Sequence, residues 1–139
     1  SLLKKYKALH LIAGNKRFQY VPSGIKKGFV KFCKQHKINH SIQENLAEKN
    51  IQQHHAYLIF SDSDLIRFIK HFRHMKWKPG SDVGLITYDE TPMKEFLLNG
   101  VTVISTDFEK MGATAGRLVA QKKKEKIANP SRLILRKTL

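Results

Sequence analysis

The sequence predicts an α/β fold in which a parallel sheet lies between two layers of helices. Short apolar segments typical of buried strands alternate with segments that have the 3.6-residue periodicity of amphipathic helices. The resulting order β-α-β-α-β-α-β favours parallel strands with helices on both faces of the sheet. A length of 139 residues fits one such domain, so residues 1–139 are expected to form a single unit.

The first half of the chain contains the first of these alternations. A strand is expected at residues 7–13, where an apolar run ends at Gly14. Pro22 suits a first helical turn, and the apolar row after it predicts an amphipathic helix. That row consists of Ile25, Phe29, Phe32 and His36. A short edge strand is expected at residues 38–42 and a weak helix at residues 44–52.

The second half repeats the pattern more clearly. Residues 56–60 are continuously apolar, as in a strand that is covered on both faces. Ser61 or Asp62 can cap the next helix, whose apolar stripe runs to Met75. Further strands are expected at residues 83–88, 101–104 and 133–135. A short helix is expected to begin at residues 91–92, and a longer one covers residues 111–120.

The charge of the chain favours acidic partners. The sequence has 26 Lys and Arg against 11 Asp and Glu, a net charge of +15. Such a balance is compatible with nucleic acid or anionic ligands, and equally with lysines spread over solvated helix faces. Cys33, the single cysteine, cannot form an internal disulfide bond, which indicates a reducing compartment. With no signal peptide and no apolar segment long enough to span a membrane, a cytoplasmic location is expected.

Motifs for catalysis or metal binding are weak. The chain has no G-x-S-x-G, Walker or G-x-G-x-x-G motif, so we expect no enzymatic activity and no cofactor. His71 and His74 lie one helical turn apart, but no third ligand has a matching spacing. We therefore expect these histidines to be exposed and no metal to be bound.

Polar residues gather instead where the predicted strands end. In open parallel sheets, ligands bind beyond the carboxyl ends of the strands. The loops at residues 14–20, 61–64 and 89–91 leave such ends. The expected ligand-binding residues are Phe18, Tyr20, Ser61, Asp62 and Asp89. Carboxylates, hydroxyls and an aromatic ring suit a small polar or polyhydroxylated molecule. The prediction of one shared site requires that Phe60 and Tyr88 end neighbouring parallel strands.

The order of several short motifs resembles the LacI/GalR family of transcriptional regulators. The similar segments are residues 8–14, 28–29, 56–65, 78–92, 101–104, 107–112 and 132–136. Each motif alone is unspecific, but their order and spacing together point to that family. The resemblance implies one lobe of a periplasmic-binding-protein-like type I domain, namely the C-terminal lobe without its helix-turn-helix head. It also implies that residues 107–130 belong to the other lobe of the full-length protein.

The resemblance carries over some functional residues and not others. Asp89 matches the family's effector-binding aspartate, although a helix-cap role is the alternative for it. Ser61 stands where the family often has a ligand-contacting Asn, whereas the family's effector-clamping Arg is Ile25 here. The positions of the family's dimer interface are Ile66, Lys70, Phe96 and Leu97.

Three functions follow as hypotheses. The first is the effector-binding and dimerisation domain of a homodimeric LacI-type regulator, which controls operator binding in response to a sugar-like ligand. DNA would be bound through the absent head. The alternatives are a sugar-binding component of an uptake system and a basic nucleic-acid-binding module. Without the other lobe, the helix at residues 111–120 is expected either to pack back on its own sheet or to exchange into a neighbouring copy.

Overall fold

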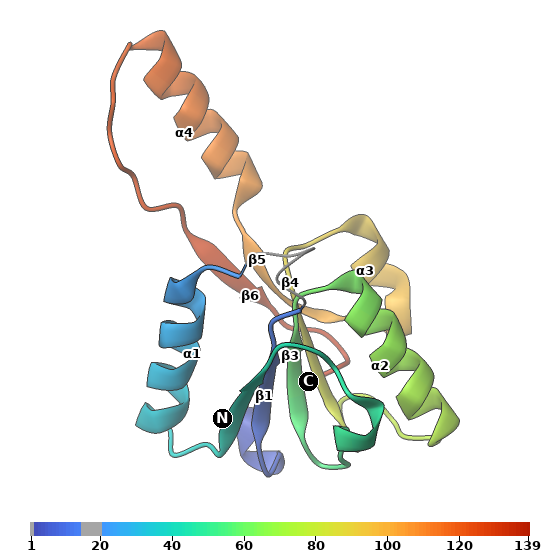
Figure 1. Ribbon diagram of the computed structural model, residues 1–139. Coiled ribbons are helices and arrows are strands. Elements are labelled where there is room, and N and C mark those ends of the chain that lie inside the picture. Colours follow the sequence, from blue (N-terminus) through green and yellow to red (C-terminus); the bar gives the residue numbers. More distant parts are fainter. Residues whose placement is uncertain (1, 15–20) are drawn as a thin grey trace.

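The computed structural model describes residues 2–14 and 21–139. These residues form one mixed β-sheet with helices packed against it (Figure 1). The six described strands are β1 (Leu9–Ile12), β2 (His40–Gln43), β3 (Ala56–Ile59), β4 (Gly84–Tyr88), β5 (Thr102–Thr106) and β6 (Ser131–Ile134). The described α-helices are α1 (Ser23–Gln35), α2 (Asp62–His74), α3 (Pro92–Phe96) and α4 (Phe108–Ala120). Short 3-10 turns occur at Leu2–Lys5 (η1), Glu48–Asn50 (η2) and Leu97–Asn99 (η3).

The strand order is β2-β1-β3-β4-β5-β6, and the first five strands are parallel. The sequence-based fold class is therefore confirmed, with one difference. β6 runs antiparallel to β5, and Thr106 is paired with Ser131. The chain leaves the sheet after β5 and returns at the same edge, so that β6 has to run in the opposite direction.

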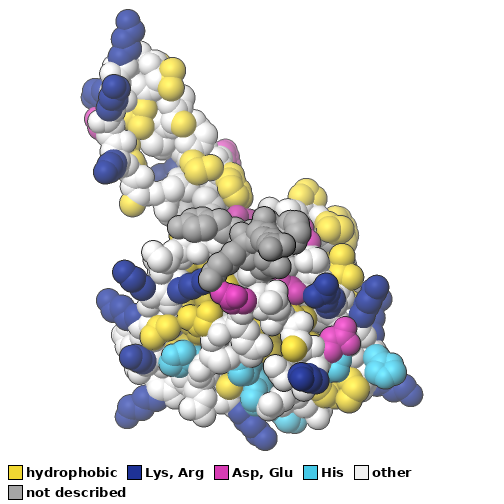
Figure 2. Space-filling model, viewed as in Figure 1, with side chains coloured by type: hydrophobic (Ala, Val, Ile, Leu, Met, Phe, Trp, Pro, Cys, Tyr) yellow, Lys and Arg dark blue, Asp and Glu magenta, His cyan; other side chains and the backbone are white. Residues whose placement is uncertain are grey.

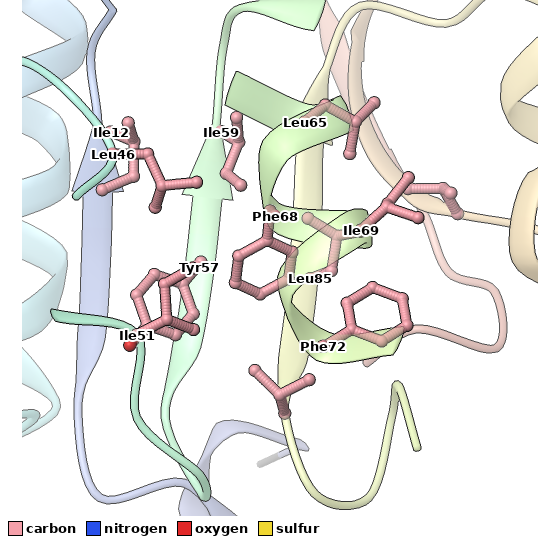
Figure 3. Close-up of a cluster of buried hydrophobic side chains, with 12 residues drawn as sticks. Ile12, Leu46, Ile51, Tyr57, Ile59, Leu65, Phe68, Ile69, Phe72 and Leu85 are labelled. Carbon is pink, nitrogen blue, oxygen red and sulfur yellow. The ribbon is translucent and has the colours of Figure 1, made fainter. Parts of the chain in front are cut away.

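Two buried clusters hold the sheet between its helices. On one face, α2 inserts Leu65, Phe68 and Phe72 against Tyr57, Leu85 and neighbouring strand residues (Figure 3). On the other face, α1 places Phe29 and Cys33 against strand residues that include Leu11 and Leu58. The i, i+3, i+4 and i+7 spacing of the α2 residues explains this packing, because it places them on one side of the helix.

The segment between β2 and β3 does not form the expected helix. Only the three-residue turn η2 is present there, while Leu46 and Ile51 reach the core from either side of it. Asn45 and Asn50 lie within or beside this short stretch, and asparagine competes with helical hydrogen bonds through its own side chain. Local sequence therefore favours a loop that is anchored by two apolar side chains.

The helix α4 does not pack back on its own sheet, so this alternative was wrong, while exchange into a neighbouring copy stays a prediction. Figure 1 shows it projecting from the edge at which β5 ends and β6 begins. None of its residues is buried, and Met111 and Val119 are exposed. Asp107 is the N-cap residue of α4, and its carboxylate accepts a hydrogen bond from the Lys110 N–H at 2.9 Å.

Among the described residues, no helix is long and apolar enough to cross a membrane.

Candidate functional site

The ends of β3 and β4 lie side by side, as the sequence predicted. The two strands are parallel, with Ile59 paired to Thr87. Directly after this pair, the rings of Phe60 and Tyr88 stack with their centroids 4.6 Å apart. The loops that begin at Ser61 and Asp89 therefore leave the same edge of the sheet.

Ser61 begins the helix that follows β3. Its Oγ accepts a hydrogen bond from the Asp64 N–H at 3.0 Å and donates one to the Asp64 carboxylate at 2.9 Å. The capping role expected for Ser61 or Asp62 thus belongs to Ser61. Asp62 occupies the first turn of α2 and is exposed. A carboxylate at this position is stabilised by the helix dipole.

Asp89 joins the end of β4 to the end of β5. Its Oδ1 accepts a hydrogen bond from the Thr106 N–H at 3.2 Å, and its own N–H donates to the Ile104 carbonyl at 2.8 Å. The residue adopts a left-handed conformation with φ of 55°. The helix-cap alternative for Asp89 was wrong, because Thr91 is the N-cap residue of α3 and makes no side-chain cap hydrogen bond. Among the described residues, no hydrogen bond engages the second carboxylate oxygen of Asp89.

No pattern in the sequence singles out Lys94, whose side chain holds this turn through backbone carbonyl groups. Its side chain is buried, and Nζ donates to the carbonyls of Tyr88 at 2.8 Å and Asp89 at 2.7 Å. Burial lowers the pKa of Lys94, while the carboxylates of Asp62, Asp89 and Glu90 act in the opposite direction. The ammonium group of Lys94 is thus held by the backbone of the turn itself.

Glu90 connects the same turn to the returning C-terminal segment. Its Oε2 lies 2.6 Å from Arg136 Nη1, and its N–H donates to Ser105 Oγ at 3.2 Å. Arg136 Nη1 also donates to the Val101 carbonyl at 3.0 Å. The turn after β4 is consequently held by β5 and by the chain beyond β6, which makes it a rigid part of the sheet edge.

The remaining expected site residues are placed as follows. Phe18 and Tyr20 lie outside the described residues. Ile25, which replaces the family's arginine, packs against the buried cluster under α1. The sequence pattern identifies neither Lys94 nor Arg136, because each has the sequence context of an ordinary surface cation and only the fold brings it to the turn after β4.

The residues expected at a dimer interface lie on α2 and around α3. Ile66 and Phe96 are exposed, with 54% and 80% of their accessible surface remaining, and Lys70 is exposed as well. Leu97 is half-buried and packs against the α2 cluster. Figure 2 shows apolar side chains over this side of the molecule.

Histidines form one polar contact that the sequence did not reveal. His10 Nε2 lies 2.8 Å from His55 Nδ1, and His10 Nδ1 lies 2.8 Å from Ser41 Oγ. Burial, with a smaller contribution from His55, lowers the pKa of His10 to about 4. Within the described part of the chain, no group of three His, Cys, Asp or Glu residues could hold a metal ion. His71 instead packs edge-on against Trp77, with centroids 5.8 Å apart.

Comparison with known proteins agrees with this architecture. In open α/β sheets, polar loops beyond the carboxyl ends of the strands are the usual place for a ligand site. The family model for the periplasmic binding protein-like domain matches residues 3–139, and the chain belongs to this family. No curated protein has a significantly similar sequence.

Solved structures with the same fold include transcriptional regulators. A probable maltose operon transcriptional repressor from Staphylococcus aureus is 17% identical with a TM-score of 0.72, covering 96% of this chain and 54% of that chain. A periplasmic binding protein/LacI transcriptional regulator from Alkaliphilus metalliredigens, complexed with D-xylulofuranose, is 16% identical with a TM-score of 0.71. The match covers 99% of this chain and 59% of that chain. The Escherichia coli transcriptional repressor AscG is 14% identical with a TM-score of 0.71, and the match covers 96% of this chain and 55% of that chain.

The chain thus spans about half the length of these structures. The resemblance to LacI/GalR regulators that the sequence motifs indicated is confirmed at the level of the fold.

Proposed function

We propose that this chain is the effector-binding and dimerisation lobe of a LacI-type transcription regulator, with a small polyhydroxylated molecule as its effector. The position of the Asp89 carboxylate at the common edge where β3 and β4 end, held at 3.2 Å by the Thr106 N–H, carries the proposal. Ionised carboxylates only accept hydrogen bonds, and the hydroxyls of a sugar are matching donors. One structural neighbour with the same fold is complexed with D-xylulofuranose, which supports this ligand class.

Asp89 is proposed as the central ligand contact. Its Oδ1 is engaged by Thr106 and its backbone is held by Lys94, so the carboxylate has a fixed direction before any ligand arrives. Such preorganisation reduces the entropy lost on binding. Ser61 and Asp62 line the neighbouring strand end, and Phe18 and Tyr20 follow the end of β1 in sequence.

Regulation requires the two lobes of a sensor to respond together. In this proposal the ligand lies between this lobe and a second one, and it favours one arrangement of the two. Residues 107–130 would then belong with the second lobe. A separate DNA-binding head would respond to the arrangement of lobes, and a catalytic step plays no part.

Dimerisation is proposed through the exposed apolar residues of α2 and α3. Ile66 and Phe96 are the principal contacts, with Lys70 and Leu97 beside them. A patch of this kind on a globular protein marks an interaction surface. Replacing Ile66 or Phe96 by Asp is expected to reduce the mass measured by light scattering, whereas Glu48→Gln on η2 leaves it unchanged.

Isothermal titration with D-xylulose, D-ribose, D-glucose and maltose tests the ligand proposal. At least one of these sugars is expected to bind, and Asp89→Asn is expected to weaken that binding tenfold or more. The matched control Glu48→Gln removes a carboxylate from an exposed turn outside the site and leaves the affinity unchanged. Equal affinities for the Asp89→Asn variant and the unmodified chain would contradict the role of Asp89.

A further inference from the structure

The sheet has an open edge at β2. This strand is the last one in the sheet order, and among the described strands only β1 pairs with it. The carbonyls of Asn39 and Gln43 accept hydrogen bonds from the β1 side. Because backbone groups alternate in direction along a strand, the N–H and C=O groups of His40 and Ile42 point the other way, out of the sheet. β2 therefore presents the donors and acceptors of two residues at this edge.

The usual devices that block further pairing are largely missing from β2. Proteins protect edge strands with charged side chains, proline, bulges or short length. The sequence of β2, HSIQ, contains no Lys, Arg, Asp, Glu or Pro, and its register with β1 is continuous. Only its length of four residues limits pairing. An added strand could therefore form main-chain hydrogen bonds with His40 and Ile42.

A row of lysines on α1 lies beside this edge. The helix has four lysines and no acidic residue. Together with Val30 and Ile42, these lysines line an open hollow of about 540 Å³. The four are Lys26, Lys27, Lys31 and Lys34. Since Ile42 belongs to β2, the hollow connects the helix with the open strand, and Figure 2 shows Lys and Arg side chains over the side of the molecule that carries α1.

The charge of these lysines is not neutralised within the described part of the chain. None of the four ammonium groups forms a hydrogen bond or an ion pair there, and both ion pairs between described residues join other groups. Lys27 and Lys31 are four residues apart on the helix, and Lys31 and Lys34 are three apart, so that like charges are neighbours. An acidic partner would relieve this repulsion.

This surface is separate from the surfaces of the proposed function. The effector-binding loops lie at the carboxyl ends of the strands, and residues 107–130 follow β5. β2 is at the opposite end of the strand order from β5 and β6. The dimer surface is proposed on α2 and α3, and α2 covers the other face of the sheet from α1. The proposed function therefore places nothing on β2 or on the lysines of α1.

We propose that the α1–β2 edge, formed by the four lysines, Val30 and the outer side of β2, binds an acidic extended segment of a partner protein. The segment adds to the sheet as a strand beside β2. Main-chain hydrogen bonds to His40 and Ile42 hold its backbone, and its carboxylates meet the ammonium groups of α1. Because every second side chain of a strand points to the same face, an alternating acidic pattern fits this edge.

Charge and backbone geometry decide between possible occupants. A second copy of this chain, paired through its own β2, would bring two rows of lysines together, and the chain has a net charge of +15. Like charges that meet across an interface weaken binding. A nucleic acid duplex supplies negative charge but cannot continue a β-sheet. The outward backbone groups of His40 and Ile42 therefore favour an acidic peptide segment.

Fluorescence anisotropy with labelled octapeptides tests the proposal. The probe is a capped peptide of alternating glutamate and threonine. One reference peptide has lysine in place of every glutamate, and another has proline in place of every threonine, which keeps the charge but removes half of the backbone donors. Only the probe is expected to bind. Equal binding of the proline peptide would overturn strand addition, and a probe that does not bind would overturn the whole proposal.

Paired variants test the lysines. Lys27→Glu/Lys31→Glu places two carboxylates in the hollow and is expected to weaken binding of the probe about tenfold. Lys123→Glu/Lys124→Glu changes the net charge by the same amount at exposed residues away from this edge, and it is expected to leave the affinity unchanged. Equal effects of the two pairs would show that only net charge attracts the peptide, which contradicts the proposal.

The backbone contact is tested at Ile42. Ile42→Pro removes the outward N–H and leaves the pairing of β2 with β1 in place, since proline is tolerated where the N–H of an edge strand faces solvent. It is expected to weaken probe binding, whereas Ile42→Val keeps both the N–H and the affinity. Identical affinities of the Pro and Val variants would contradict strand addition.

Amide hydrogen exchange in the unmodified chain locates the contact without any substitution. Addition of the probe is expected to slow exchange at His40 and Ile42, while Ser41, whose N–H points toward β1, keeps its rate. Protection of α1 alone, or of the loops at residues 61–62 and 89–90, would contradict the proposal. A labelled DNA duplex serves as the comparison. If the duplex binds through Lys27 and Lys31 while the probe does not bind, the surface is a nucleic-acid contact and the proposal is wrong.

Discussion

Replacement of Asp89 tests how the turn after β4 is held. Asp89 contributes a carboxylate that accepts the Thr106 N–H, and its backbone has a left-handed conformation that Ala adopts poorly. The hydrogen bond is charge-assisted but long at 3.2 Å, which places its contribution at about 1.5 kcal/mol, the lower end of that class. The left-handed conformation adds about 1 kcal/mol for Ala.

Three substitutions separate these two contributions. Asp89→Asn keeps an acceptor oxygen and tolerates the left-handed region, so a loss below about 1 kcal/mol in the free energy of unfolding is expected. Asp89→Gly removes the acceptor without backbone strain and is expected to lose about 1.5 kcal/mol net. Asp89→Ala has both penalties and is expected to lose about 2.5 kcal/mol.

Urea unfolding followed by the fluorescence of the single tryptophan, Trp77, measures these differences. The predicted order of stability is Asn above Gly above Ala. If Asp89→Ala and Asp89→Gly are equally stable, the argument from backbone conformation is refuted. If all three variants have the same free energy of unfolding as the unmodified chain, the hydrogen bond between Asp89 and Thr106 contributes nothing to stability.

Other predictions concern buried groups away from the site. Tyr6→Phe should raise the free energy of unfolding by about 1 kcal/mol, because the buried Tyr6 hydroxyl has no hydrogen-bond partner among the described residues; an unchanged urea midpoint counts against this. Gly84→Ala should lower the free energy of unfolding by about 1–3 kcal/mol, because an added Cβ would lie 2.8 Å from both Ala56 Cβ and the Tyr6 ring. An unchanged free energy of unfolding would show that the Tyr6 ring can move aside. Burial lowers the pKa of His10 from 6.5 to about 4. Between these pH values the unfolded chain binds a proton that the folded chain does not, so stability falls as the pH is lowered. His10→Gln should flatten that pH dependence, and an unaltered slope assigns it to another group.

Much of the fold could be predicted because the relevant information is local. The apolar run at residues 56–60 and the helical spacing of Leu65, Phe68 and Phe72 determine a buried strand and the side on which α2 packs. The loop between β2 and β3, which contains η2, could not be predicted in the same way. Residues 44–52 contain no glycine or proline that would exclude a helix, and the tertiary contacts of Leu46 and Ile51 that anchor the loop are not visible in the sequence.

The candidate site was predictable to the extent that strand order determines it. Once Phe60 and Tyr88 end adjacent parallel strands, Ser61 and Asp89 begin neighbouring loops. The buried ammonium of Lys94 depends on how a five-residue helix is placed after the turn, and no sequence pattern specifies that placement. The partnership of Glu90 with Arg136 joins residues far apart in the chain, and periodicity carries no signal for such pairs.

The direction of α4 shows a different limit. Its amphipathic pattern predicts a helix that needs a covering surface, and the structure confirms the helix while leaving the surface open. Hydrophobic periodicity identifies which side must be buried but not against what.

Amide chemical shifts, recorded while the chain is titrated with whichever sugar binds in the calorimetric experiment, test most directly whether one polar site spans the ends of β3 and β4. The largest shifts are expected together at Ser61, Asp62, Asp89 and Glu90 with one common dissociation constant, and Asp89→Asn is expected to raise that constant tenfold or more. Shifts concentrated on α1 or β6, with residues 61–62 and 89–90 unchanged, would contradict it.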